Sequence, residues 1–103
     1  MKFLRFAIMD IPKTAEVAQA SDKVWASPPS GISVLASYAC QGIPFLGAPA
    51  NSLVAIQVIE AESNEAIAAT QWPVSLAGAY VYDVPILEFP AAAAAQTEKK
   101  YRG

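Results

Sequence analysis

The chain contains no histidine and only one cysteine among its 103 residues. Histidine carries most general acid–base catalysis near neutral pH, and histidine and cysteine are the usual ligands of zinc. Histidine-based catalysis, histidine-ligated haem and a thiolate zinc site are therefore excluded, and we expect no cofactor and no bound metal. Cys40 has no second cysteine with which to form an internal disulfide, which is typical of a reduced, cytoplasmic setting.

Charged residues are also scarce, at 16% of the chain against about 25% in average globular proteins. The net charge of −2 provides no basic patch that would neutralise nucleic-acid phosphates, because the only basic cluster lies in the tail at residues 99–102. No apolar run approaches the ~20 residues that cross a bilayer. Arg5 and Asp10 interrupt the opening stretch, which otherwise resembles a signal peptide. We therefore expect neither nucleic acid nor a membrane as partner.

Hydrophobic residues, in contrast, make up 54% of the chain, above the usual fraction of about 45–50%. A chain of this length forms one domain with one core, and this composition leaves more apolar surface than such a core accommodates. A subunit interface is the plainest place for the excess, so we expect a homodimer.

The pattern of apolar residues repeats one layout twice: strand, helix, strand. We expect strands over residues 2–11, 32–41, 53–60 and 80–89, a first helix ending near Trp25 and a second following Ser63. This is the βαββαβ order of a ferredoxin-like α+β sandwich with a four-stranded antiparallel sheet. Residues 1–90 form this domain, and residues 91–103 form an alanine-rich tail that is either helical or disordered.

Local signals refine this layout. The weakly hydrophobic second strand and the fourth strand, which contains Pro85, suit the edges of the sheet, whereas the third strand reads as central. Pro73 predicts a break in the second helix. Residues 42–51 read as a loop with an apolar tip at Phe45 and Leu46.

Three polar residues stand inside otherwise apolar strands: Arg5, Gln57 and Asp83. In the ferredoxin-like order the first strand lies between the third and the fourth, and strand alternation places all three on one face. We expect them to converge. They form either a structural ion pair that orders the sheet or a subunit interface, or the polar anchor of a small-molecule cavity.

Two aromatic residues complete the candidate set for a ligand pocket or an interface. Tyr38 lies on the second strand, where an amphipathic packing role is more common than a chemical one. Trp72 lies on the second helix, and we expect it to close the helix layer against the sheet together with Trp25. Cys40 has no basic neighbour in sequence, so we interpret it as a small core or edge residue.

Four stretches carry a resemblance to a known superfamily: residues 2–4 (KFL), 28–35 (PPSGISVL), 58–63 (VIEAES) and 84–87 (VPIL). They resemble small proteins of the dimeric α+β barrel superfamily, which includes muconolactone isomerases and antibiotic-biosynthesis-type monooxygenases. The resemblance implies a homodimer in which two four-stranded sheets pack face to face with helices outside. Its enzymes often use residues in the cleft between sheet and helices, but the sequence shows no such catalytic set.

Three hypotheses about function follow. The first is a homodimeric module, without assigned catalysis, that binds a small apolar or aromatic ligand or another protein. The second is a cofactor-independent isomerase or monooxygenase acting on a small aromatic or lactone substrate, with Asp83 or Asp10 as base and Arg5 or a tyrosine stabilising an oxyanion. In the third, the Phe45–Leu46 loop and the alanine-rich tail recruit a larger assembly.

Overall fold

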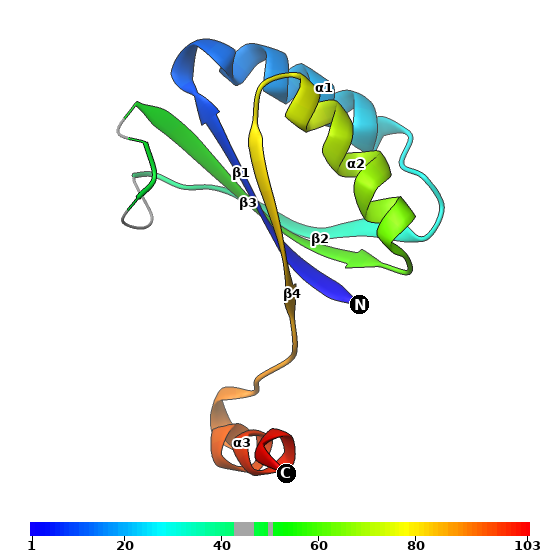
Figure 1. Ribbon diagram of the computed structural model, residues 1–103, viewed down its shortest axis with the longest axis vertical. Helices are drawn as coiled ribbons and strands as arrows, with labels where there is room; N and C mark the ends of the chain where they lie inside the picture. Colours follow the sequence, from blue (N-terminus) through cyan, green and yellow to red (C-terminus); the bar gives the residue numbers. More distant parts are fainter. Residues whose placement is uncertain (43–46, 50) are drawn as a thin grey trace.

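A computed structural model describes residues 1–42, 47–49 and 51–103 of the chain. Its four strands form one antiparallel sheet in the order β2-β3-β1-β4, and α1 and α2 lie side by side over one face of that sheet (Figure 1). In chain order the elements are β1 (Lys2–Asp10), η1 (Ile11–Lys13), α1 (Thr14–Ala26), β2 (Ile32–Ala39), β3 (Ser52–Ala61), α2 (Asn64–Leu76), β4 (Tyr80–Ile86), η2 (Ala91–Ala93) and α3 (Ala94–Arg102).

The strand order confirms several expectations. β1 lies between β3 and β4, β3 is central, and β2 and β4 are the edges. Pro85 lies opposite Phe3 on β4, which pairs with β1 alone. An edge strand tolerates proline, because the missing N–H can lie on the side without a neighbouring strand. The second edge strand, β2, carries a bulge between Val34 and Ala36. The result is an α+β fold with a four-stranded antiparallel sheet, compatible with a ferredoxin-like sandwich.

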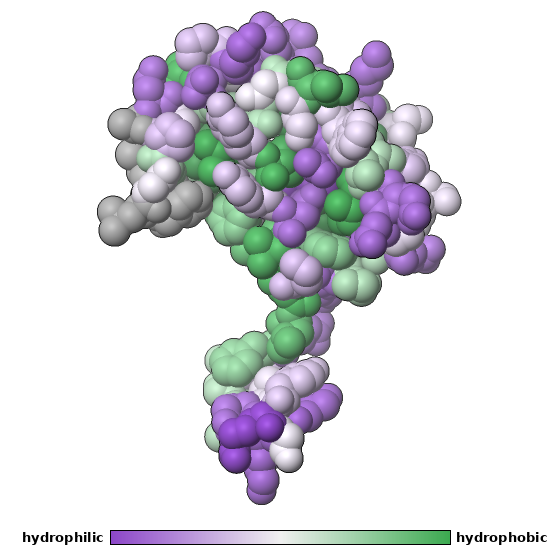
Figure 2. All heavy atoms as spheres, in the orientation of Figure 1, coloured by the Kyte–Doolittle hydropathy of each residue, from purple (hydrophilic) through white to green (hydrophobic). Residues whose placement is uncertain are grey.

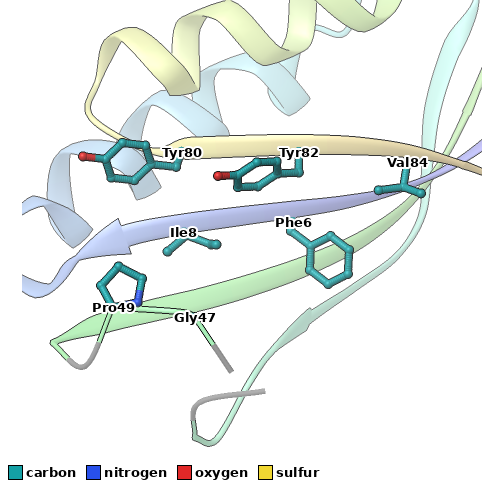
Figure 3. Close-up of a pocket in the computed structure, with 7 residues that line it drawn as sticks. All are labelled: Phe6, Ile8, Gly47, Pro49, Tyr80, Tyr82 and Val84. Atoms are coloured by element: carbon teal, nitrogen blue, oxygen red, sulfur yellow. The ribbon is translucent and has the colours of Figure 1, made fainter. Parts of the chain in front are cut away.

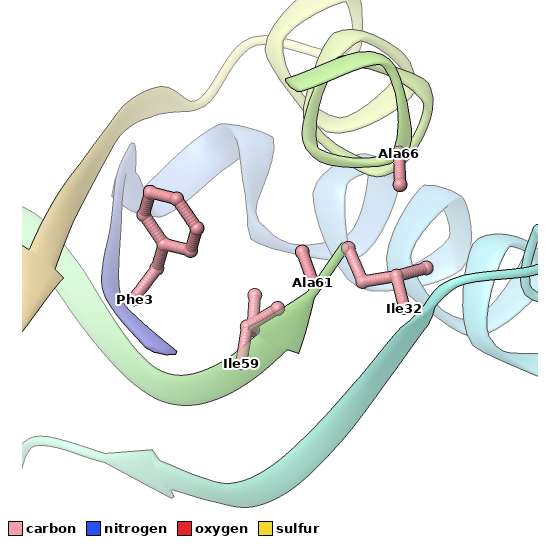
Figure 4. Close-up of a cluster of buried hydrophobic side chains, with 5 residues drawn as sticks. All are labelled: Phe3, Ile32, Ile59, Ala61 and Ala66. Carbon is pink, nitrogen blue, oxygen red and sulfur yellow. The ribbon is translucent and has the colours of Figure 1, made fainter. Parts of the chain in front are cut away.

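The hydrophobic core lies between the sheet and the two helices. Phe3, Ile59 and Ile32 project from three strands toward Ala66 of α2, and Trp25 of α1 packs against this cluster (Figure 4). Met9, Val17 and Val74 belong to a second buried cluster nearer the other end of the sheet. The first cluster contains Phe3 of β1 and the second contains Met9 of β1. The odd-numbered side chains of β1 therefore face the helices.

The start of α2 is capped by a side chain. Ser63 precedes the helix, and its side-chain oxygen accepts a hydrogen bond from the backbone N–H of Ala66 at 3.1 Å. Glu65 lies in the first turn, near the positive end of the helix dipole. Gly78, with a φ of 118°, follows the helix and lets the chain reverse into β4.

The expected break at Pro73 was wrong, because α2 continues through it to Leu76. A proline removes the backbone N–H that would bond to the carbonyl four residues earlier, here that of Ala69. The loss is tolerated near the C-terminal end, where the oxygen of Pro73 itself accepts a hydrogen bond from the N–H of Ala77. The helix therefore lacks one bond but is not interrupted.

The expectation for Trp72 was also wrong, since its side chain is 65% exposed and does not close the helix layer. The buried residues of α2 are Ala66, Thr70 and Val74, which recur every four positions and define the face toward the sheet. Trp72 is two positions from Thr70, which is roughly 200° around the helix axis. It therefore points outward, whereas Trp25 packs against the core as expected.

Among the residues that the structure describes, none forms a helix over the opposite face of the sheet. Tyr82 and Val84 of β4 and Tyr38 of β2 are on this side, and their side chains are 57%, 44% and 63% exposed. The shortest dimension of the molecule, 18 Å, fits one sheet and one helix layer. We call this uncovered surface the open face.

The tail is helical. After β4 the chain continues as an extended connector into η2 and α3, and α3 lies beyond the end of β4, apart from α1 and α2 (Figure 1). The predicted apolar loop tip, Phe45 and Leu46, lies outside the described residues. No helix in the described part of the chain is long and apolar enough to cross a membrane.

Candidate functional site

An ion pair between Arg5 and Asp83 lies inside the protein, between the sheet and α2. Arg5 Nε donates to Asp83 Oδ1 at 2.6 Å, and Arg5 Nη2 donates to Asp83 Oδ2 at 3.2 Å. The same Nη2 donates to the backbone oxygen of Ile67 at 3.3 Å. The two side chains are only 3% and 11% exposed, so each charge depends on the other for compensation. The guanidinium thus links β1, β4 and α2.

Gln57 extends this pair into a row of polar groups across the sheet. It is the direct partner of Arg5 in the β1–β3 register, and Asp83 is the partner of Arg5 in β4. Gln57 Nε2 donates to Ser37 Oγ on β2 at 3.3 Å. The structure therefore brings Arg5, Gln57 and Asp83 together on the helix side of the sheet, and their use by a ligand stays a prediction.

A cleft of about 290 Å³ lies between this polar row and helix α1. Arg5, Gln57 and Ser37 line its floor, which the sheet provides. The walls are mainly small or apolar side chains, among them Ala7, Val17, Ala18, Ala55 and Val74. A few polar groups among apolar walls are typical of sites for small molecules.

Thr14, at the start of α1, also lines this cleft. Its Oγ1 is shielded from water and has no hydrogen-bond partner within the described residues. Buried hydroxyl groups are almost always paired, because an unpaired one costs about 1–3 kcal/mol. A residue of the cleft wall therefore carries a buried hydroxyl group whose hydrogen-bonding capacity the described residues do not use.

Of the five predicted site residues, only Arg5 and Gln57 line the cleft; Asp83 lies behind Arg5, to which it is bonded. Tyr38 lies opposite Ile56 and so belongs to the open face, while Trp72 lies on the outer side of α2. The five predicted residues therefore divide into three places: the polar row at the cleft, the open face and the outside of the helix layer.

The carboxylates suggested as catalytic bases are poorly placed for that role. Asp10 is exposed at the end of β1, and both oxygens of Asp83 are engaged by Arg5. Neither residue is among those that line the cleft. The carboxylate that does line it is Asp22 of α1, on the more exposed side of that helix.

Several cleft residues escaped the sequence analysis. Ser37 was detectable, because strand pairing places it opposite Gln57. Asp22 and Ser21 are adjacent on α1 and both line the cleft, which depends on how the helix packs on the sheet. Cys40 follows β2 and lines the cleft as a half-buried free thiol, rather than being a plain core residue.

The open face carries a second, broader hollow of about 600 Å³. Side chains from β1 and β4 form its floor, namely Phe6, Ile8, Tyr80, Tyr82 and Val84, and Gly47 and Pro49 lie at its rim (Figure 3). The two tyrosine rings project side by side from β4, with the helices on the far side of the sheet. This hollow is wide and mostly apolar, which suits a protein surface better than a small ligand.

In the described part of the chain, no group of three or more His, Cys, Asp or Glu side chains is arranged to hold a metal ion. No protein-family model matches the sequence, and a comparison with curated proteins found no match.

Proposed function

We propose that this protein is a homodimeric module that binds a small apolar or aromatic ligand in the cleft between α1 and the sheet. The observation that carries the proposal is the combination of apolar walls with polar groups that retain unused hydrogen-bonding capacity. Thr14 Oγ1 is buried and has no hydrogen-bond partner among the described residues, and Arg5 and Gln57 of the polar row lie at the floor. Sites for small molecules generally have this composition.

The size and charge of the cleft limit the ligand. Its volume of about 290 Å³ is at the small end of ligand pockets, which range over roughly 300–1,000 Å³, and fits a molecule with a single ring. The charge of Arg5 is already balanced by Asp83, so a second carboxylate beside that pair would be repelled. A neutral oxygen, such as a carbonyl or hydroxyl group, suits the floor best.

The ligand part is tested by NMR titration of the ¹⁵N-labelled protein with 4-hydroxyacetophenone as the probe. We expect saturable shifts of the amide signals of Val17 and Ala55, which line the cleft. Ala18→Phe fills the cleft and should abolish these shifts, whereas Ala15→Phe, on the exposed side of the same helix, should preserve them. Saturable shifts that persist in Ala18→Phe, or that are absent from the natural protein, would refute this site.

The dimer part is supported by the open face. A sheet that is apolar on both sides is stable when both sides are covered, and here the helices cover only one. Tyr80, Tyr82 and Val84 are between 44% and 59% exposed on the other side. Packing two open faces together would produce the dimeric α+β barrel that the sequence resembles, with both helix layers outside.

Sedimentation velocity at micromolar concentration tests this association. We expect a dimer for the natural chain, a monomer for Tyr82→Arg on the open face, and a dimer for Gln19→Arg on the exposed side of α1. A monomeric natural chain would contradict the proposal, and so would a Tyr82→Arg variant that remains dimeric.

A further inference from the structure

The C-terminal helix α3 does not pack into the core formed by the described residues. It is nine residues long and contains no buried residue, and Figure 1 shows it standing apart from the helix layer. An isolated helix shorter than ~12–15 residues is marginally stable in water. A helix of this length therefore requires a surface on which to pack.

One side of α3 is suited to packing. Ala94, Thr97 and Tyr101 recur at intervals of three and four residues and so share a face, which we call the tail stripe. The Thr97 hydroxyl donates to the backbone oxygen of Ala93 at 3.0 Å, so it carries no unmet polar group into an apolar contact. Tyr101 is 61% exposed and provides most of the apolar area.

A matching surface lies on the outer side of α2. Ala69, Trp72, Pro73 and Leu76 are all exposed and form an uncharged strip, which we call the α2 stripe. Trp72 and Leu76 are 65% and 84% exposed, which is unusual for large apolar side chains that are neighbours on one helix. The strip from Ala69 to Leu76 and the one from Ala94 to Tyr101 each contain eight residues, and their ends are about 10 Å apart along the helix.

Charge selects the direction in which the two stripes would pair. Residues 91–103 carry three basic and one acidic side chain, a net charge of +2. Because the whole chain has a net charge of −2, residues 1–90 have a net charge of −4. The basic residues of α3 lie in its last turn, whereas Glu62 and Glu65 lie at the start of α2. An antiparallel arrangement brings these charges together and also opposes the two helix dipoles favourably.

We propose that the tail stripe of one copy packs antiparallel on the α2 stripe of a second copy of this chain. The tail extends from the end of β4 away from the α2 of its own chain (Figure 1). Lys2 Nζ and Glu88 Oε1, 2.7 Å apart, hold the connector in line with β4 as it passes the edge of the sheet. Hydrophobic side chains continue along β4 onto this connector, and the end of α3 is hydrophilic (Figure 2).

Disulfide trapping between two separately prepared proteins tests this contact. Both carry Cys40→Ser, so that the introduced thiols are the only ones. One carries Leu76→Cys and the other Ala94→Cys, two exposed or half-exposed sites that the antiparallel arrangement places opposite each other. On mild oxidation of the mixture we expect a covalent heterodimer on a denaturing gel, at several times the yield of the mixture of Ala69→Cys with Ala94→Cys.

The matched control keeps the tail cysteine at position 94 and moves the α2 cysteine from position 76 to position 69, at the other end of the α2 stripe. The two α2 positions are about 10 Å apart. Equal yields from the two mixtures, or no heterodimer in either, would overturn the proposal. A chain with both Leu76→Cys and Ala94→Cys that closes its disulfide within one monomer would also overturn it, because the tail would then return to its own α2. Repeating the experiment with Tyr82→Arg, which we expect to sediment as a monomer, separates this contact from packing of the open faces. Trapping of the tail should persist there, because oxidation captures a tail contact that is too weak to hold a dimer during sedimentation.

Discussion

The buried charge of Arg5 is compensated by one residue only, and this dependence yields a quantitative expectation. Removing one member of a buried ion pair typically costs 3–5 kcal/mol, because the other charge stays buried and unpaired. We therefore expect Arg5→Leu to lower the free energy of unfolding by about 3–5 kcal/mol in urea denaturation, since Asp83 is only 11% exposed.

The double variant Arg5→Leu with Asp83→Leu serves as the control, because it removes both charges and leaves neither unpaired. We expect it to be clearly more stable than Arg5→Leu alone. Equal or additive losses would show that the pair is not coupled in the way that its two hydrogen bonds indicate.

Two threonines with opposite surroundings test the interpretation of the cleft. Thr14 Oγ1 is buried without a partner, whereas the Thr70 hydroxyl donates to the oxygen of Ile67 at 3.0 Å and Thr70 is fully buried. Valine has the same shape without the hydroxyl group. We expect Thr14→Val to raise the free energy of unfolding in the absence of ligand, and Thr70→Val to lower it, each by about 1 kcal/mol. The melting temperature should shift in the same direction. If both variants lose stability equally, the Thr14 hydroxyl is satisfied in solution.

Residue positions within strands were the most predictable part of the site. The period of two in β1, β3 and β4 was enough to place Arg5, Gln57 and Asp83 on one face, because antiparallel register then makes them neighbours. Thr14 and Asp22 were not predictable in this way. Their relation to the cleft depends on how α1 sits on the sheet, which no local pattern in the sequence specifies.

Helix α2 contains a proline, Pro73, which lowers the stability of the helix without interrupting it. Pro73 leaves the carbonyl of Ala69 without its usual helical donor. We expect Pro73→Ala to raise the free energy of unfolding by about 1–3 kcal/mol, less than or equal to the cost of a proline in a helix interior. Thermal denaturation followed by circular dichroism checks this, and a loss of stability would mean that Pro73 supports packing outside its own helix.

The connector to α3 is attached by the pair of Lys2 and Glu88. The hydrogen bond from Lys2, together with its charge, lowers the pKa of Glu88, and the same contact raises the pKa of Lys2. The contribution of Glu88 is present above the pKa that its carboxyl group has in the unfolded chain. It is lost as the pH falls through the lower value of the folded state. Both groups are exposed, so the effect on stability is small.

NMR titration measures this contact directly. We expect Glu88→Gln to return the pKa of Lys2 toward its ordinary value, while Glu62→Gln, a removal of an acid elsewhere, should leave it raised. An unchanged Lys2 pKa in Glu88→Gln would show that the connector is not held at this point, and would weaken the argument for the direction of the tail.

Elements were predicted better than their outward faces. The pattern of apolar residues predicted the order and approximate bounds of the strands and of α1 and α2. The orientation of Trp72 was missed because α2 is rich in alanine, so several stripes of the helix look equally apolar in sequence. The tail could be interpreted as either helical or disordered, since alanine favours a helix and the short length disfavours it.

The molecule as a whole is more extended than a compact domain of its length. The radius of gyration is 15.3 Å, compared with about 13 Å for a compact domain of this length, because α3 extends away from the sandwich. The open face and the α2 stripe are both apolar surfaces that nothing in the described chain covers. Composition predicted this surplus, but only the structure divides it between a sheet face and a helix face.

The most direct test of the central proposal locates the contact between two copies. An isotope-filtered NOE experiment on a mixture of labelled and unlabelled protein reports only protons that are close across a subunit interface. We predict intermolecular NOEs between the rings of Tyr80 or Tyr82 and the methyl groups of Val84, all on the open face. A protein that shows no intermolecular NOE from these side chains, with amide exchange that leaves β4 unprotected at micromolar concentration, would contradict the dimer proposed here.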